Sequence, residues 1–482
     1  MTSLNDLRFD TAWVNGEAAV TEATFDVVNP ASNEVVSAVA DGDRLLIDEA
    51  ISVAADAFVV WSALDAAQRV AKLEIWANAI ESHAEELAAI TTAESGKLFR
   101  EARGEVGAGV AAIRWAGQVA LRTEGDTLPS PTETRRHYTT KQPVGVVACI
   151  TPWNFPIAAV LVKVGAALAA GCSVVVKPSE ETPMVALALA HLSKDSDLPR
   201  GVLNVVPTSA PATFGDAIAE RKEVRAVSFT GSTKVGKQLY GACANTMKRV
   251  HLELGGNAPF VVFDDADVDR AVNDAVNARF YNAGQICVGA NRFFIHDRVF
   301  DEFSTKLTER VAALRTGPGS EDDSDLGPLI NRRAKDHFGS LLDDAVDKGA
   351  EVLVGGVGDD PGSLFVEARV LTSVSSDMDV YRKEIFGPMA CLYRFDDGDD
   401  VIALANDTDA GLAAYAYSQN EARLVKAGEQ LEAGVVGLNT TQIFSSDLPF
   451  GGVKESGVGR EHGENCLEEF LDTKSFSLEQ GE

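Results

Sequence analysis

The chain has 482 residues, and the 45% that are hydrophobic provide enough apolar material for a large buried core and more than one domain. Its 43 basic and 72 acidic residues give a formal net charge of −29, which repels phosphate backbones and anionic lipid headgroups. The composition therefore argues against nucleic acid and membrane surfaces as partners.

The N-terminal stretch and the cysteines bear on the compartment. The first ten residues, MTSLNDLRFD, lack the basic and apolar regions of a secretory signal, which predicts a cytoplasmic protein. The six cysteines are sparse and never form a C-x-x-C pair. We therefore expect reduced thiols, with no disulfide scaffold and no metal site.

In chain order, helices come first. From residue 40 to about 120, alanine- and glutamate-rich segments carry a helical period. Residues 122–140 change to polar alternation with prolines, which predicts a hairpin that leaves the main body, as an assembly arm or as an exposed flap. Beyond it, short apolar runs alternate with helical stretches. This alternation predicts an α/β fold with a largely parallel sheet covered on both faces.

Residues 157–176 are apolar over a length that would cross a bilayer. Pro156 precedes the run, Lys163 lies within it and Gly171 divides it. This punctuation favours an amphipathic helix followed by a buried strand over a membrane span.

A possible phosphate site lies in AVSFTGSTKVGKQ, which runs from a strand through a glycine loop into a helix. Gly231, Gly236 and Lys237 match the nucleotide-triphosphate loop G-x-x-x-x-G-K. However, Gln238 stands where a Ser or Thr hydroxyl should bind magnesium. The loop therefore favours the pyrophosphate of a dinucleotide over a nucleotide hydrolase, although the usual G-x-G-x-x-G is missing.

Alternating aspartates at Asp265, Asp267 and Asp269 briefly resemble a calcium loop. That loop needs Gly at its sixth position and Glu at its twelfth, where this chain has Arg270 and Val276. We expect these aspartates to cap a helix instead.

Three residues carry chemistry that the sequence alone leaves open. Cys287, in GQICVGANR, is either a core thiol or a nucleophile, and a nucleophile needs a base, an oxyanion site and an electron acceptor. Glu253 precedes two glycines and is either structural or a general base whose pKa is raised in a cleft. Asn154, in TPWNFP, is either a helix cap or a rigid amide for an oxyanion hole.

Eight segments resemble, in order, those of the aldehyde dehydrogenase superfamily, and locally they look most like its succinate-semialdehyde dehydrogenase branch. They are TPWNFP, GAALAAGCSVVVKPSE, SFTGSTKVG, ELGGNAPF, GQICVGANR, EIFGP, NDTDAGLAAY and LPFGGVKESGVGRE. The resemblance implies a Rossmann-type cofactor domain, an α/β catalytic domain and a β oligomerisation arm that joins chains into homodimers or homotetramers.

The implied domains have these boundaries. Residues 1–121 and 144–254 form the NAD-binding domain, and residues 255–450 form the catalytic domain. The bridging arm and tail comprise residues 122–143 and 451–482.

The resemblance also implies catalytic roles. The thiolate of Cys287 would attack an aldehyde carbonyl, and Asn154 with the backbone N–H of the cysteine would hold the oxyanion. Hydride transfer to a nicotinamide would leave a thioester. Glu253 would then activate the water that hydrolyses this thioester to a carboxylic acid, which favours hydrolysis over acyl transfer to coenzyme A.

The cofactor roles follow in the same way. Lys177 and Glu180 would contact the adenine ribose, Ser232 the pyrophosphate, and Glu384 and Phe386 the nicotinamide ribose and ring. A carboxylate at 180 favours NAD, while a lysine and a serine beside it keep NADP possible. The predicted cofactor-binding set also contains Thr151, Pro152, Trp153, Ser179, Gly231 and Leu254.

Substrate choice rests on two missing arginines. Members of that branch hold the substrate carboxylate with arginines at the places occupied here by Tyr281 and Val162, and Arg279 and Arg292 lie nearby only in sequence. The sequence therefore predicts an aromatic or medium aliphatic aldehyde, with succinate semialdehyde as the alternative. The predicted pocket residues are Phe155, Val162, Tyr281, Ile286, Val288 and Phe444.

Two further expectations concern the nucleophile. Gly289 stands where many members of the branch have a second cysteine, so a disulfide switch with Cys287 is impossible here. A catalytically idle homologue, in which that thiol is unreactive core, is the competing hypothesis from another class.

Overall fold

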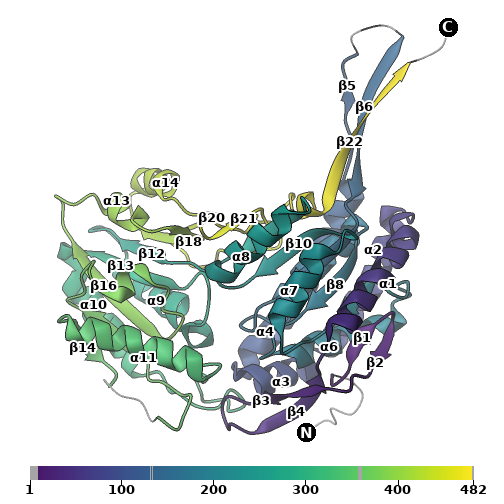
Figure 1. Cartoon of the computed structure of the whole chain (residues 1–482). Helices are drawn as coiled ribbons and strands as arrows, with labels where there is room; N and C mark the ends of the chain where they lie inside the picture. The colour runs from purple at the N-terminus through teal and green to yellow at the C-terminus, as the bar shows by residue number, and fades with distance from the viewer. Residues whose placement is uncertain (1–8, 131, 133, 357–360, 480–482) are drawn as a thin grey trace.

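The computed structural model describes residues 9–130, 132, 134–356 and 361–479. Two large sheets with their helices form the body, and a slender three-stranded arm projects from it (Figure 1). Within the described residues, no helix is long and apolar enough to cross a membrane. The predicted α/β arrangement is present, divided between two sheets.

The first sheet has eight strands, parallel from β9 to β11 and antiparallel at both edges. In spatial order they are β2 (Glu17–Ala19), β1 (Ala12–Val14), β9 (Leu203–Val205), β8 (Ser173–Lys177), β7 (Val146–Ile150), β10 (Val224–Thr230), β11 (Arg249–Glu253) and β21 (Gly457–Val458). The helices of this half are α1 (Arg44–Ser62), α2 (Ala66–Ser82), α3 (Ala84–Ser95), α4 (Phe99–Arg122), α5 (Ala158–Ala170), α6 (Pro183–His191), α7 (Pro211–Glu220) and α8 (Thr233–Ala244).

Helix α5 and strand β8 arise from the apolar run at 157–176, as predicted. Gly171 ends the helix with a φ of 99°, a left-handed conformation that glycine adopts without a steric penalty. The predicted amphipathic character is wrong, because Lys163 is only 1% exposed. Lys163 lies against the Ser228 hydroxyl of β10 and Glu461 of the C-terminal segment, and helices α2 and α4 also pack on α5.

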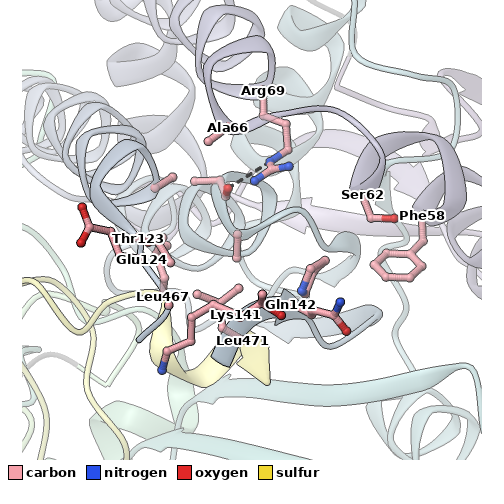
Figure 2. Close-up of a pocket in the computed structure, with 16 residues that line it drawn as sticks. Phe58, Ser62, Ala66, Arg69, Thr123, Glu124, Lys141, Gln142, Leu467 and Leu471 are labelled. Atoms are coloured by element: carbon pink, nitrogen blue, oxygen red, sulfur yellow. Dashed lines mark hydrogen bonds between the residues drawn. The ribbon is translucent and has the colours of Figure 1, made fainter. Parts of the chain in front are cut away.

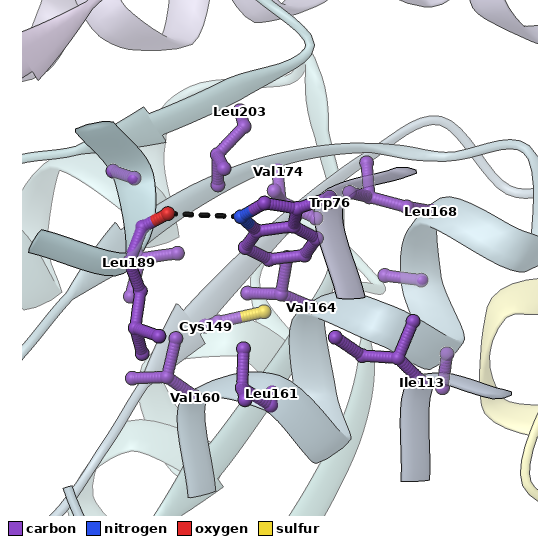
Figure 3. Close-up of a cluster of buried hydrophobic side chains, with 14 of the residues drawn as sticks. Trp76, Ile113, Cys149, Val160, Leu161, Val164, Leu168, Val174, Leu189 and Leu203 are labelled. Atoms are coloured by element: carbon purple, nitrogen blue, oxygen red, sulfur yellow. Dashed lines mark hydrogen bonds between the residues drawn. The ribbon is translucent and has the colours of Figure 1, made fainter. Parts of the chain in front are cut away.

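The core of the first half contains Trp76, whose Nε1 donates to the carbonyl oxygen of Leu189 at 2.9 Å (Figure 3). Cys149 of β7 belongs to the same cluster and is fully buried. Burial raises the pKa of its thiol to about 12, which leaves it uncharged at neutral pH. Cys149 is thus an ordinary core thiol, against which Cys287 is compared below.

The second sheet has seven strands, all parallel except for the β14–β15 pair at one edge. In spatial order they are β14 (Glu351–Val354), β15 (Arg369–Thr372), β16 (Met389–Phe395), β13 (Ala290–His296), β12 (Ala258–Val262), β18 (Ala413–Tyr417) and β19 (Val435–Leu438). Its helices are α9 (Val268–Phe280), α10 (Asp297–Ala312), α11 (Arg332–Asp347), α12 (Asp379–Arg382), α13 (Val401–Asn406) and α14 (Glu421–Gln430).

The arm contains the predicted hairpin and one strand more. Strands β5 (Thr127–Leu128) and β6 (Arg135–Pro143) are antiparallel, and β22 (Leu471–Glu479) pairs with β6 along its full length. The C-terminal segment therefore pairs with a strand from the first third of the chain (Figure 1). The domain boundaries given above stay predictions.

The three aspartates near residue 265 have different roles. Asp267 caps α9, because its side chain accepts a hydrogen bond from the Arg270 backbone N–H at 3.1 Å. Asp265 instead accepts from the Ser418 hydroxyl at 2.7 Å, and Asp269 pairs with Lys306 at 2.6 Å. The capping prediction is confirmed for one of the three residues.

Short elements complete the description: β3 (Thr24–Val28), β4 (Val35–Ala40), β17 (Ala410–Gly411), β20 (Val453–Lys454) and the 3₁₀ turns η2 (Leu192–Asp195), η3 (Tyr281–Gly284) and η4 (Glu468–Phe470).

Candidate active site

The predicted catalytic residues come from three segments that meet between the two sheets. Asn154 follows β7, Glu253 ends β11, and Cys287 lies in the loop before β13. The chain at Gly256 passes so close to this loop that a Cβ there would lie 2.3 Å from the carbonyl oxygen of Cys287. Glycine at this position is therefore required by the close approach of two backbones.

A side-chain amide holds the loop before Cys287. Gln285 accepts from the Ile330 N–H at 2.9 Å, and its Nε2 donates to the carbonyl oxygens of Asn282 and Pro328 at 3.2 and 3.3 Å. Both ends of the amide are thus satisfied inside the protein, which fixes the loop against the 328–330 segment.

Strain is stored just upstream. Asn282 and Ala283 have φ angles of 50° and 52°, in the left-handed region that costs non-glycine residues of the order of 1 kcal/mol or more. The surroundings hold this conformation: Glu101 accepts from the Asn282 N–H at 3.2 Å, and Arg279 donates to the carbonyl oxygen of Gly284. The turn therefore presents Cys287 in one fixed geometry.

Asn154 points toward this loop. Its Nδ2 donates to the carbonyl oxygen of Gln285 at 2.9 Å, and Asn282 donates to the Asn154 carbonyl oxygen at 3.2 Å. An amide nitrogen carries two hydrogens, so one stays available for a developing oxyanion. The helix-cap alternative is wrong, because α5 begins at Ala158 and has no side-chain cap.

Cys287 differs from the other five cysteines, all of them described by the structure, because it alone is part-exposed. Burial of its sulfur raises the pKa of the thiol above its ordinary range, and the charges of Glu384 and Glu253 raise it further. The backbone N–H groups of Cys287 and Val288 oppose this shift because they stabilise a thiolate. The carboxylate of Glu253 is therefore close enough to Cys287 to affect the titration of its thiol.

Glu253 is a buried carboxyl with no hydrogen-bond partner on either oxygen. Burial raises its pKa well above the ordinary value, and the charge of Glu461 adds to the rise against Lys163 and Arg460. A buried, unpaired carboxyl with a raised pKa is what a general base for water requires.

Four polar residues that sequence reasoning missed form a chain behind Glu253. Lys163 donates to Glu461 at 2.6 Å and to the Ser228 hydroxyl at 3.2 Å, and that hydroxyl lies 3.0 Å from His251 Nδ1. Only His251 carried a signal, as an ionisable residue two positions before Glu253 on a strand and thus on the same face.

The cofactor residues cluster at two places. At the first, Ser232 caps α8 by accepting from the Val235 N–H at 3.4 Å, and Gly231 precedes it, so the N-terminus of this helix lies next to the glycine loop. At the second, Lys177 donates to Glu180 at 3.0 Å. Burial alone would raise the pKa of Glu180, but the charge and hydrogen bond of Lys177, a backbone hydrogen bond and the charge of Arg333 together outweigh burial, and the net shift is downward. Glu180 is therefore an ionised acceptor.

Aromatic rings and a carboxylate from both sheets approach the catalytic loop. Trp153 and Phe386 meet edge to face with ring centres 5.5 Å apart. Glu384 accepts from the Gly256 N–H at 3.1 Å, and burial raises its pKa to about 7. Of the remaining predicted cofactor residues, Thr151, Ser179 and Leu254 are buried, and Pro152 is part-exposed.

The predicted substrate pocket is partly assembled. The rings of Phe155 and Tyr281 stack with centres 6.3 Å apart, and Val162 is one of three part-exposed residues of α5, with Ala158 and Ala159. Phe444 is 56% exposed and packs against Phe450. Ile286 and Val288 are both buried, and Val288 belongs to the core of the second sheet.

No free guanidinium reaches this pocket from the two arginines near the nucleophile. Arg279 donates to Ala290 and Asn291, and Arg292 donates to the carbonyl oxygens of Asn257 and Ala405; both arginines are fully buried. Their charges are committed to protein acceptors.

Charged residues missed by sequence reasoning lie beside the aromatic pair. Lys97 sits over the Phe155 ring, with Nζ 4.1 Å from its centre, and forms a buried ion pair with Glu105. Glu101 affects the titration of Tyr281, and burial raises the pKa of this glutamate itself to about 7. These residues come from α4 and the segment before it, far from the motifs in sequence.

A separate cavity of about 670 Å³ lies at the base of the arm, between α1, α2, α4 and β6 (Figure 2). Arg69, whose Nε donates to the carbonyl oxygen of Ala169 at 3.2 Å, reaches into it, and Lys141 and Glu124 lie at its border. None of the predicted site residues lines this cavity.

Comparison with known proteins places this chain in a family. The aldehyde dehydrogenase family model matches residues 13–476. A probable NADP(+) succinate-semialdehyde dehydrogenase of Sinorhizobium fredii is 46% identical over 93% of this chain and 92% of its own length. The NADP(+) succinate-semialdehyde dehydrogenase of Escherichia coli is 44% identical over 96% of this chain and 95% of its own.

The fold comparison agrees. The crystal structure of succinate-semialdehyde dehydrogenase from Burkholderia pseudomallei superposes with a TM-score of 0.97 at 44% identity, over 99% of both chains. The fold resemblance drawn from the sequence is confirmed. The chain belongs to the aldehyde dehydrogenase family and is an oxidoreductase that acts on aldehydes.

Proposed function

We propose that Cys287, Asn154 and Glu253 oxidise an aldehyde to its carboxylic acid through a thiohemiacetal and a thioester. The observation that carries this proposal is the buried carboxyl of Glu253, with both oxygens unpartnered, near the one part-exposed cysteine among the described residues. A structural carboxyl would have hydrogen-bond partners, since burial without them is costly.

The steps follow from the positions of these groups. The sulfur of Cys287 forms a bond to the aldehyde carbon, and the thiol proton leaves to solvent. The resulting oxyanion accepts from the Asn154 amide and the Cys287 backbone N–H. Loss of hydride from the same carbon gives a thioester. Glu253 then removes a proton from water, the hydroxide adds to the thioester, and the C–S bond breaks to release the acid.

The cofactor is proposed to be NAD, with NADP also accepted. The residues fit a dinucleotide, because the capped N-terminus of α8 offers free N–H groups to a pyrophosphate and the ionised Glu180 accepts from ribose hydroxyls. When bound, the nicotinamide accepts the hydride. Trp153, Glu384 and Phe386 would orient that ring toward Cys287.

For the substrate, the relatives favour the alternative reading of the sequence over the aromatic or medium aliphatic one. We therefore propose succinate semialdehyde as the first candidate, since relatives 44–46% identical to this chain carry that name. Apolar aldehydes are the second candidate, supported by the Phe155–Tyr281 stack and by the missing arginines.

A panel of aldehydes separates these candidates. We expect kcat/KM for succinate semialdehyde to exceed that for benzaldehyde, measured with each cofactor by the absorbance of the reduced nicotinamide. Tyr281→Arg serves as the matched variant, because a guanidinium there adds a charge-assisted partner for the carboxylate and should raise the ratio further. A parent ratio below one would overturn the semialdehyde assignment and favour the apolar one.

A homo-oligomer is proposed from the arm, whose three strands project from the body with exposed side chains. The family resemblance puts two or four chains in the assembly. The cytoplasmic location stays a prediction.

A further inference from the structure

A buried histidine lies close to the unpaired carboxyl of Glu253. His251 lies on the same strand and is 2% exposed, and its Nε2 is 3.4 Å from Oε1 of Glu253. In this conformer neither atom makes a hydrogen bond with any group. Two buried polar atoms so close together, both unsatisfied, point to a contact that forms in another protonation or rotamer state.

The hydrogen bonds behind the ring fix its tautomer. The Lys163 side chain is a hydrogen-bond donor only, so the Ser228 hydroxyl oxygen accepts from its Nζ at 3.2 Å. The hydroxyl proton is then free to go to Nδ1 of His251, 3.0 Å away. Within the described residues this hydroxyl has no other hydrogen-bond partner, so donation to Nδ1 is the arrangement that leaves no buried proton unpaired. In that arrangement Nδ1 accepts, and the neutral ring carries its proton on Nε2.

The ring is neutral under ordinary conditions, because burial lowers the pKa of His251 to about 4. An Nε2–H that faces a carboxylate at 3.4 Å needs only a small rotation of the carboxyl to donate to it. The bond would stabilise the ionised form of Glu253 and fix the direction of its other oxygen.

We propose that His251, with its tautomer set by Ser228, is a positioning residue that donates from Nε2 to the ionised Glu253 and keeps that carboxylate ready to activate water. This inference rests on the proposed role of Glu253 as general base. The role assigned to His251 and Ser228 concerns the base alone, and neither the attack by Cys287 nor the binding of the cofactor depends on it.

Other charged groups face the same pair and must be held constant. Glu461 opposes ionisation of Glu253, whereas Lys163 on α5 and Arg460 on the C-terminal segment favour it. Variants at position 251 leave these three charges in place. A difference between such variants therefore reports the imidazole donor itself.

The test compares His251→Leu with His251→Gln. Leucine fills space without a donor, while glutamine places an amide N–H close to the position of Nε2. We expect the leucine variant to keep its hydride burst. The acid limb in the pH profile of its thioester hydrolysis should move to higher pH by about one unit. At a pH on that limb, this shift corresponds to turnover roughly tenfold slower than in the parent. The glutamine variant should restore most of the parent profile.

Ser228→Ala gives a second, independent readout. Without the hydroxyl the ring can place its proton on either nitrogen, so the acid limb should move in the same direction by a smaller amount. Thermal unfolding of each variant verifies that it is folded before its pH profile is compared.

Two outcomes would overturn the inference: a folded leucine variant with the parent pH profile, or a glutamine variant no better than leucine. Failure of the underlying function looks different. If Glu253→Gln turned over at the parent rate, Glu253 would not be the base at all, whatever the position 251 variants did.

Discussion

At the scale of single residues, the site depends on buried ionisable groups. Glu253, Glu384 and Glu101 are carboxyls whose pKa burial raises, to about 7 for the last two. A general base must be ionised to act, so the hydrolytic step should speed up as pH rises through the raised pKa of Glu253. The same burial destabilises the fold wherever these groups are forced to ionise.

Glu101 offers a test of that cost. Its folded pKa of about 7 lies above the ordinary value of 4.5, so the proton is bound more tightly in the folded state. Stability from this group is fully present below pH 4.5 and is lost as pH rises to 7. Glu101→Gln, which can still accept from the Asn282 N–H, should raise the free energy of unfolding at pH 8 by up to about 3 kcal/mol.

The measurement is urea unfolding of parent and variant at several pH values. The difference should be small at pH 4.5 and constant above pH 7. A variant equally stabilised at both ends of the range would show that the effect is packing and not ionisation.

At the scale of secondary-structure elements, the loop between η3 and β13 is the part that local sequence describes least well. The turn η3 just before it contains two left-handed residues: Asn282, a type that tolerates this conformation, and Ala283, which gives no turn signal. The loop is held by contacts with α4 and with the 328–330 segment. These contacts come from the tertiary fold, which a periodicity argument does not reach.

Gly256→Ala tests the close approach at this loop. The added Cβ would meet the carbonyl oxygen of Cys287 at 2.3 Å, so we expect a loss of roughly 1–3 kcal/mol in stability and a larger loss in kcat, because the cysteine must move. Gly241→Ala in α8 is the control: a Cβ there meets nothing within 4 Å, and the helix should gain up to about 1 kcal/mol. Equal activity in the two variants, assayed side by side, would show that the loop tolerates displacement.

At the scale of the whole molecule, the arm joins distant parts of one chain. Strand β22 supplies the pairing partner of β6 from Pro143 to Arg135. Deletion of residues 471–482 would leave one edge of β6 with unpaired backbone groups. We expect the shortened chain to lose its native assembly or to aggregate, as measured by size-exclusion chromatography with light scattering.

The control for this deletion is Arg135→Ala, which removes only an exposed ion pair with Glu479. Exposed pairs contribute less than about 1 kcal/mol, so assembly should be retained. If the deletion left the parent's assembly intact, the arm would be an exposed flap and not an assembly element.

The sequence was most informative where one segment contains both a candidate catalytic residue and the structural residues that position it. TPWNFP, ELGGNAPF and GQICVGANR each carry one predicted catalytic residue beside the structural residues that fix it, and the three segments meet around Cys287. The chain behind Glu253 was out of reach, because Lys163 is 65 positions from Ser228 and 298 from Glu461. The Lys97–Glu105 ion pair is local in sequence, but its position beside the Phe155 ring comes from the tertiary fold.

The most direct test of the account is the intact mass of Glu253→Gln after mixing with aldehyde and NAD. We predict one hydride burst with parent amplitude and an acyl adduct on Cys287 that persists, because the variant forms the thioester but lacks the base that hydrolyses it. Steady turnover at the parent rate with no adduct would contradict the central claim that Cys287 and Glu253 act on one substrate in sequence.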